Sequence, residues 1–151
     1  MGKARIRRRK GCTFHGPVRE ACILWRFMDG LLFLTGSCAY PTLEMVWRGR
    51  THYSMALAGG LCLTLIGRIC CGPLSHRSLA LRCLTGSGII TGVELCTGLV
   101  VNHLLGFGVW DYKDMPLNIL GQVCLPYSLL WCLLTLPAMA LCDLLKGIKL
   151  D

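Results

Sequence analysis

The chain has 151 residues, of which 54% are hydrophobic and only 16% are charged, and its formal net charge is +8. Soluble domains are about 45–50% apolar and about 25% charged. The composition therefore excludes an ordinary soluble domain and indicates an integral membrane protein.

Residues 1–26 are strongly basic, with eight Lys and Arg side chains and a single carboxylate, Glu20. A basic segment of this kind can bind nucleic acid. Next to an apolar run, however, it more often sets the membrane topology and contacts anionic lipid head groups. We therefore predict a cytoplasmic N-terminal tail over residues 1–26 and no nucleic-acid partner.

Four apolar runs follow this tail. They cover residues 27–47, 53–72, 84–106 and 117–142. A helix of about 20 residues crosses a hydrocarbon core of about 30 Å, and backbone groups in lipid must form their hydrogen bonds within the protein. The predicted fold is therefore an all-α membrane protein with four transmembrane helices within residues 27–145 and a short cytoplasmic tail at 146–151.

The distribution of Lys and Arg in the flanks and linkers predicts the orientation. Most of these residues fall on the side of the N-terminus, so both termini are expected in the cytoplasm. Arg48 and Arg50 fall on the predicted outer side, against this trend. We expect a partner residue to hold them there.

The first run carries a carboxylate, Glu44, near its outer end, one turn after Pro41. Proline lacks a backbone N–H and should kink the helix. We expect Glu44 to pair with Arg48, Arg50 or His52, because a carboxylate at the hydrocarbon edge needs a partner. Arg50 and His52, together with Asp111 in the linker 107–116, are candidates for an outer latch. Packing by hydrogen bonds remains the alternative role for Glu44. For Asp111 the structural alternatives are to cap a turn or to pair with Arg50.

The third run carries a carboxylate, Glu94, near mid-bilayer. An ionisable side chain at the centre of a span costs about 2.5–3.5 kcal/mol on insertion, so it is a functional candidate. Polar or small residues at spacings of three and four place one stripe on this face of the helix. The stripe consists of Ser87, Thr91, Glu94, Gly98 and Asn102. It must face protein or water, and we predict polar neighbours for Glu94 from the first or fourth helix.

Four of these polar residues are candidates for lining a transport pathway within the membrane: Glu94, Thr91, Asn102 and Glu44. A fifth candidate is Gln122, near the start of the fourth run. Hydrogen bonding between helices explains the same residues without transport. Gly88 and Gly92 lie on another face of the third run, where they could let a further helix approach closely.

Several kinds of chemistry lack a signal in the sequence. The eleven cysteines include no Cys-x-x-Cys pair, so we predict packing residues and no metal site. Gly-x-x-x-x-Gly-Lys-Ser/Thr, His-Glu-x-x-His and Gly-x-Ser-x-Gly are also absent. We predict no cofactor and no catalytic residue, and this chain is not expected to hydrolyse ATP by itself.

Motifs along residues 30–140 resemble one known family. They are Tyr40-Pro41-x-x-Glu44, Arg50-Thr51-His52-Tyr53-Ser54, Gly59-Gly60, Gly88-x-x-Thr91-x-x-Glu94-x-x-x-Gly98, Trp110-Asp111-Tyr112, Pro116-x-Asn118, Gly121-Gln122 and Trp131. In order and spacing the set is similar to the bacterial family labelled putative ABC-transporter type IV. The resemblance implies a permease-like component of the bacterial inner membrane, crossing it several times.

Three functions compete at this point. The first is a transport-associated subunit in the lipid bilayer, acting as a homo-oligomer or with a separate ATPase subunit. The second is a structural or regulatory membrane protein whose polar stripes hold helices together. The third is a membrane enzyme on a lipid-linked substrate, with Glu94 or Asp111 as general base. The surroundings of Glu94 discriminate between them: a cavity open to water, a sealed helix interface or a cleft open to lipid.

Overall fold

The computed structural model describes residues 16–147, with side chains from residue 25 onward. Its elements are α1 (Gly16–Arg48), α2 (Tyr53–Ile69), α3 (Leu79–Gly98), the π-helical segment η1 (Leu99–Leu104), β1 (Asn118–Ile119), β2 (Val123–Cys124) and α4 (Leu125–Gly147). The chain is thus mainly helical, and the two short strands pair as an antiparallel hairpin.

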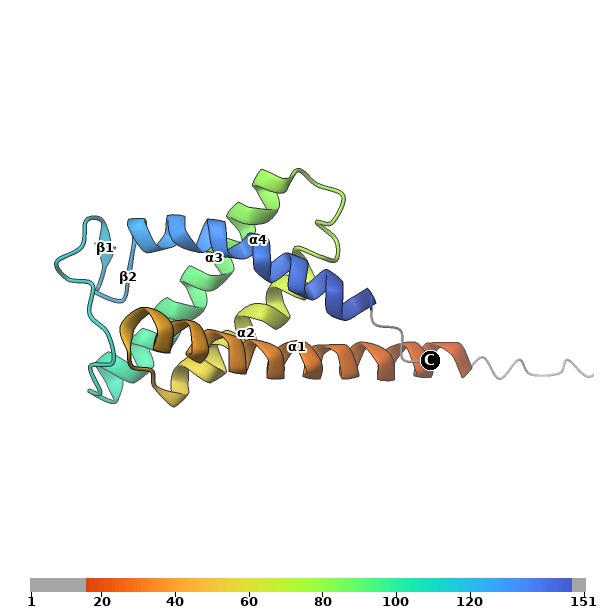
Figure 1. Cartoon of the computed structure of the whole chain (residues 1–151), viewed down its shortest axis with the longest axis horizontal. Coiled ribbons are helices and arrows are strands. Elements are labelled where there is room, and N and C mark those ends of the chain that lie inside the picture. Colours follow the sequence, from red (N-terminus) through yellow and green to blue (C-terminus); the bar gives the residue numbers. More distant parts are fainter. Residues whose placement is uncertain (1–15, 148–151) are drawn as a thin grey trace, which may run out of the picture.

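The helices place the chain ends and the hairpin at opposite ends of the molecule. Figure 1 shows the beginning of α1 and the end of α4 at one end, together with the connection from α2 to α3. The β1–β2 hairpin, η1 and the connection from α1 to α2 lie at the other end. This arrangement is the one expected from an even number of helices that traverse the molecule.

Helix α1 begins earlier than predicted. It starts at Gly16, so residues 16–26 of the predicted tail are helical, whereas residues 1–15 lie outside the described part. Charge opposes burial in lipid but does not oppose helix formation, and Arg is a good helix former. The basic composition therefore predicted which residues avoid the hydrocarbon but did not predict where the helix begins. Pro41 lies inside α1 without ending it.

Helix α3 also begins before its predicted start at residue 84. Ser78 caps it, with its hydroxyl accepting a hydrogen bond from the backbone N–H of Leu81 at 3.4 Å. Such a side-chain cap satisfies one of the free N–H groups of the first turn. The helix then continues into η1, which ends at Leu104 rather than at the predicted residue 106.

The fourth predicted run is wrong at its start. Residues 117–124 form the β1–β2 hairpin, and α4 begins only at Leu125. Leu117, Leu120 and Gly121 have positive φ angles, which a helix cannot accommodate. The Asn118 amide stabilises the turn by donating to the carbonyls of Lys113 and Met115. The run is apolar throughout, so hydropathy did not separate a hairpin from a helix.

The predicted second run is close to α2, which ends at Ile69 rather than at residue 72. The end of α4 at Gly147 lies beyond both the predicted end of the fourth run at residue 142 and the start of the predicted tail 146–151. Residues 148–151 are outside the described part.

Two helical stretches of the described chain are long and apolar enough to cross a membrane. They are Leu79–Leu104, formed by α3 and η1, and Leu125–Gly147, which is α4. Helix α2 is apolar but shorter, with 17 residues. The four predicted spans are therefore supported for two helices by length and composition.

Close packing occurs between α1 and α2. A Cβ atom added at Gly36 would overlap the carbonyl oxygen of Gly59, and one added at Gly60 would lie 2.5 Å from the Ser37 hydroxyl. Gly88 and Gly92 have no atom within 4 Å of an added Cβ in the described structure. Within the described chain no other helix approaches Gly88 or Gly92 closely, and glycines of α1 and α2 make the close contact instead.

Candidate functional site

Glu94 lies in the interior of the helix bundle, and only 3% of its surface is exposed. One carboxyl oxygen accepts a hydrogen bond from the Tyr40 hydroxyl of α1 at 3.2 Å. The other accepts from the Trp131 indole N–H of α4 at 2.7 Å. The predicted interior position, with polar neighbours from the first or fourth helix, is confirmed for both helices.

The partners of Glu94 are neutral. The ion pairs found among the described side chains do not include it. Two hydrogen-bond donors therefore hold this carboxyl group without a neighbouring cation in salt-bridge contact. Such an arrangement accommodates an ionised carboxylate as well as a carboxylic acid whose proton faces the tyrosine oxygen.

Other polar residues of the stripe contact α4 and the segment between η1 and α4. Thr91 and Ser128 share a hydrogen bond at 3.0 Å, and Ser87 donates to the backbone carbonyl of Ser128 at 2.5 Å. Asn102 donates to Gln122 at 2.7 Å. The structure thus joins Thr91 to α4 and joins Asn102 to Gln122, each through protein partners.

Asn102 and Gln122 fix the segment that leads from η1 to α4. Asn102 also donates to the carbonyl of Trp110 at 3.0 Å and accepts from the backbone N–H of Val109 at 2.7 Å. The Trp110 indole donates to the carbonyl of Gln122 at 2.9 Å. In the structure these two pathway candidates therefore hold the buried Trp110 of this segment against Gln122.

Glu44 pairs with Arg48, the first of the three partners predicted for it. The Arg48 Nη1 lies 3.1 Å from one carboxylate oxygen, and the Thr51 hydroxyl donates to the other at 2.8 Å. The spacing of four residues places both side chains on one face of α1. The prediction of a nearby cation for Glu44 is confirmed.

The three outer latch candidates have separate surroundings. His52 caps α2, where its Nδ1 accepts from the backbone N–H of Ser54. Asp111 pairs with Lys113 at 3.0 Å, rather than with Arg50 as considered from the sequence. No described hydrogen bond or ion pair joins Arg50, His52 and Asp111 to one another, and a shared role as a latch stays a prediction.

Asp111 lies outside the helices, in an exposed turn. The pKa of its carboxyl group is lowered, mainly by the hydrogen bond with the Lys113 side chain and then by the Lys113 backbone N–H. The local structure of this turn therefore favours the charged carboxylate.

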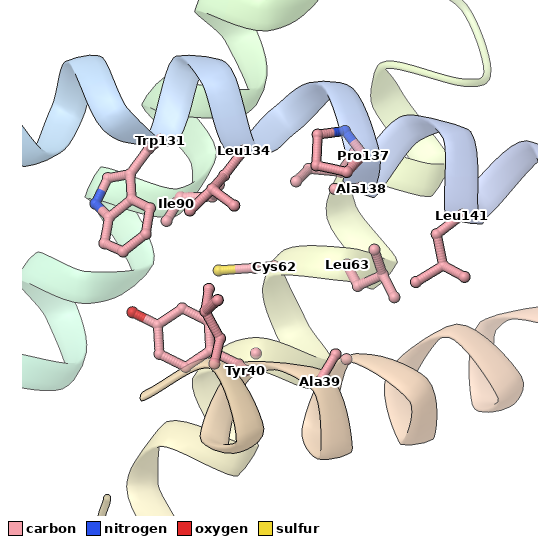
Figure 2. A pocket seen from close by; sticks show the side chains of 14 residues that line it. Ala39, Tyr40, Cys62, Leu63, Ile90, Trp131, Leu134, Pro137, Ala138 and Leu141 are labelled. Atoms are coloured by element: carbon pink, nitrogen blue, oxygen red, sulfur yellow. The ribbon is translucent and has the colours of Figure 1, made fainter. Parts of the chain in front are cut away.

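Two cavities lie between α1 and α4. The larger one measures about 250 Å³ and the smaller about 210 Å³. Tyr40, Leu43, Trp131 and Leu134 line both cavities, so these residues lie at the boundary between them. Figure 2 shows the larger cavity, with α4 side chains on one side, Tyr40 and Ala39 of α1 on the other, and Cys62 and Leu63 of α2 between them. Glu94 therefore holds, through hydrogen bonds, two of the side chains that separate the cavities.

Trp131 was missed as a partner of Glu94, although the resemblance includes it. A signal existed in the sequence, because an indole N–H buried in an apolar helix needs an acceptor. Tyr127, one turn earlier in α4, was also missed; its ring stacks on Tyr112 with centroids 4.7 Å apart.

Basic side chains hold the end of the bundle where α2 leads to α3 and α4 ends. Arg68 of α2 forms an ion pair with Asp29 of α1. Lys146 of α4 donates to the carbonyls of Gly67, at 2.7 Å, and of Cys71. A cation near the carbonyls that end a helix is favourable, so these contacts connect the end of α2 to α1 and α4.

Among the side chains that the structure describes, no group of three His, Cys, Asp or Glu residues is arranged to hold a metal ion. The cysteines in this part of the chain are unpaired, and several are buried in the core.

Comparisons with known proteins support one family. No curated protein and no solved structure matches the chain. The sequence model of one family matches residues 31–146, which include the helices and the hairpin that build the site. The chain therefore belongs to the family described as "Putative ABC-transporter type IV".

Proposed function

We propose that the chain is a small permease-like membrane subunit that acts as an oligomer or together with partner chains, including a separate ATPase. Its family supports a transport-associated role. The proposal places it in the bacterial inner membrane with four spans and both termini in the cytoplasm. Labelling of single cysteines introduced at positions 113 and 77 tests this topology, and reaction of residue 77 from outside would contradict it.

The observation that carries the proposal is the position of Glu94. A carboxyl group within an apolar helix is costly, and such groups commonly mark the path of an ion or substrate. Glu94 holds Tyr40 and Trp131, the residues at the boundary between two cavities. A change in its protonation or hydrogen bonding would therefore alter the constriction between these cavities.

Glu94 itself lines neither cavity and lies in a sealed helix interface, which favours a structural role as the second candidate. Both oxygens of Glu94 already accept hydrogen bonds, one from α1 and one from α4. Interhelical hydrogen bonds of this kind hold membrane helices together. The two roles differ in whether the ionisable carboxyl group is needed or only its hydrogen bonds.

The variant Glu94→Gln separates these roles. Glutamine can accept from the Trp131 indole through its oxygen and donate to the Tyr40 oxygen through its nitrogen, so it keeps both contacts. It removes only the ability to ionise. A transport role predicts lost activity with nearly unchanged stability, whereas a packing role predicts that the variant is tolerated.

The experiment begins with affinity purification in mild detergent, in which an ATPase chain with a P-loop motif is expected to co-purify. The complex is then reconstituted in lipid nanodiscs, and its ATP hydrolysis is measured. We expect Glu94→Gln to lower the rate at least tenfold with a melting temperature near that of the wild type. Asp114→Asn removes an exposed carboxylate of the outer turn and serves as the control.

Two results would contradict the proposal in different ways. A full hydrolysis rate in Glu94→Gln would exclude an ionised functional carboxylate and favour the structural role. If the subunit purifies without any P-loop chain, in detergents that keep it folded, the proposal of a separate ATPase partner would be contradicted.

A further inference from the structure

We propose that the groove between α1 and α4 binds one acyl chain of an anionic phospholipid, with the lipid phosphate held by Arg48. The two cavities of about 250 and 210 Å³ form this groove. The inference rests on the membrane placement within the proposed function, but it does not depend on transport.

The groove has an apolar mouth that opens at the surface. On α1 it is lined by Ala39, Leu43 and Trp47, which follow one another at spacings of four and share one helix face. All three are exposed, Leu43 at 44% and Trp47 at 70%. Apolar side chains that line a cavity and also reach the surface provide a lateral entrance from the surrounding membrane.

The opposite wall and the floor are apolar as well. Figure 2 shows Leu134, Ala138 and Leu141 of α4 facing the α1 side of the groove. Leu63 and Ile66 of α2 form the floor of the groove, between α1 and α4. An apolar cavity of this kind gains nothing from water, and an acyl chain matches its lining.

The other end of the groove is polar, and its Arg48, although ion-paired with Glu44, has hydrogen-bond donors left over. Glu44, Arg48 and Tyr112 line the smaller cavity there. Both oxygens of Glu44 already accept hydrogen bonds, from Arg48 and from Thr51. Arg48 has five N–H donors, and its described hydrogen bond uses only Nη1. The remaining hydrogen-bonding capacity at this end is therefore that of a cationic donor.

A phosphate group fits this donor, because guanidinium binds phosphate oxygens in a bidentate geometry. The exposed Trp47 at the same end is typical of a membrane–water interface. The order along the groove, from an apolar channel to a cationic donor beside an interfacial aromatic ring, is the order of tail and head group in a phospholipid. With the predicted topology the lipid belongs to the outer leaflet.

A helix of a second copy is a poorer occupant. An α-helix with side chains is about 10–12 Å across. Cavities of about 250 and 210 Å³ are too small to hold a cylinder of that width. A free phosphate ion would use Arg48 but would leave the apolar channel without an occupant. A lipid uses both parts of the groove.

The test measures retention of phosphatidylglycerol by native mass spectrometry of the purified full chain. Ala39→Phe places a ring in the groove, and Ala140→Phe adds the same volume at an exposed position of α4 that does not line it. We expect one lipid per wild-type chain, at least tenfold less retention in Ala39→Phe, and unchanged retention in Ala140→Phe. Equal retention in the two variants would overturn the groove as the binding site.

A second arm of the experiment tests the head group. Arg48→Gln can keep a hydrogen bond to Glu44 but removes the cation, so retention should fall several-fold. Millimolar inorganic phosphate should not displace the lipid. Complete displacement by phosphate would show a free-anion site instead, and unchanged retention in Arg48→Gln would exclude Arg48 as the phosphate ligand. ATP hydrolysis is not needed for any of these measurements, so they fail or succeed separately from the transport proposal.

Discussion

Helix α1 packs against α2 and against α4 in two different ways. Toward α2 it presents Gly36 to Gly59, and each glycine lies where a Cβ atom would overlap the other helix. Toward α4 it presents Tyr40 and Leu43, and cavities remain beside them. The same helix therefore has one face that permits close backbone contact and another that keeps its neighbour at a distance.

The difference shows how side-chain size divides a bundle into fixed and adjustable interfaces. Small residues allow close contact of helix backbones and many dispersion contacts. Large side chains with cavities between them can change rotamers without moving the backbone. In the described part of the chain, no hydrogen bond joins α1 directly to α4; Glu94 of α3 connects them through Tyr40 and Trp131. The adjustable interface thus depends on one carboxyl group.

The largest expected effect comes from removing that connection. Glu94→Leu leaves the Tyr40 hydroxyl and the Trp131 indole N–H without their acceptor, at a cost of about 1–3 kcal/mol for each buried group. We expect a clear fall in the thermal unfolding midpoint in detergent, whereas Glu94→Gln should stay near the wild type. Equal midpoints for the Leu and Gln variants would show that these hydrogen bonds contribute little to stability.

A smaller effect is expected at the close interface. In Gly59→Ala the new methyl group would lie 2.5 Å from the Gly36 carbonyl oxygen, which belongs to the backbone and cannot rotate away. Overpacking of this kind costs about 1–3 kcal/mol. The midpoint should therefore fall in Gly59→Ala.

Gly88→Ala is the matched control for this substitution. An added Cβ at Gly88 meets no atom within 4 Å in the described structure. Alanine is favoured over glycine within a helix by roughly 0.5–1 kcal/mol, so this variant should be neutral or slightly more stable. If Gly59→Ala were as stable as Gly88→Ala, the α1–α2 interface would not be the fixed one.

The sequence predicted the surroundings of the two buried carboxyl groups better than it predicted the helix ends. Glu44 and Arg48 are one turn apart, so their pairing follows from local geometry. The interior position of Glu94 follows from the cost of charge in lipid. The identity of its partners did not follow, because Tyr40 and Trp131 are brought to it by the packing of three helices.

The hydropathy pattern of the sequence predicted neither the β1–β2 hairpin nor the groove between α1 and α4, for different reasons. The hairpin replaced the start of the fourth run because Asn118 and Gly121 favour a turn, a local signal that apolar neighbours obscured. The groove depends on the distance between α1 and α4, and the hydrophobic periodicity of the sequence does not specify that distance. Helix existence was thus readable from hydropathy, whereas cavities required the tertiary arrangement.

The smallest effect is expected far from both interfaces of α1, in the exposed turn that carries Asp111 and Lys113. The hydrogen bond with the Lys113 side chain lowers the pKa of Asp111 in the folded protein. A group with a lowered folded pKa stabilises the fold above its unfolded pKa, which is about 3.9 for Asp, and this contribution is lost as the pH falls through the folded pKa. Wild type should therefore lose slightly more stability than Asp111→Asn between pH 7 and pH 3.

Unfolding midpoints at both pH values measure this difference, with Asp114→Asn as the control for loss of an exposed carboxylate. The effect should shrink in high salt, because both side chains are exposed and their charges are screened. An identical pH dependence in wild type and Asp111→Asn would show that the Asp111–Lys113 pair does not stabilise the turn.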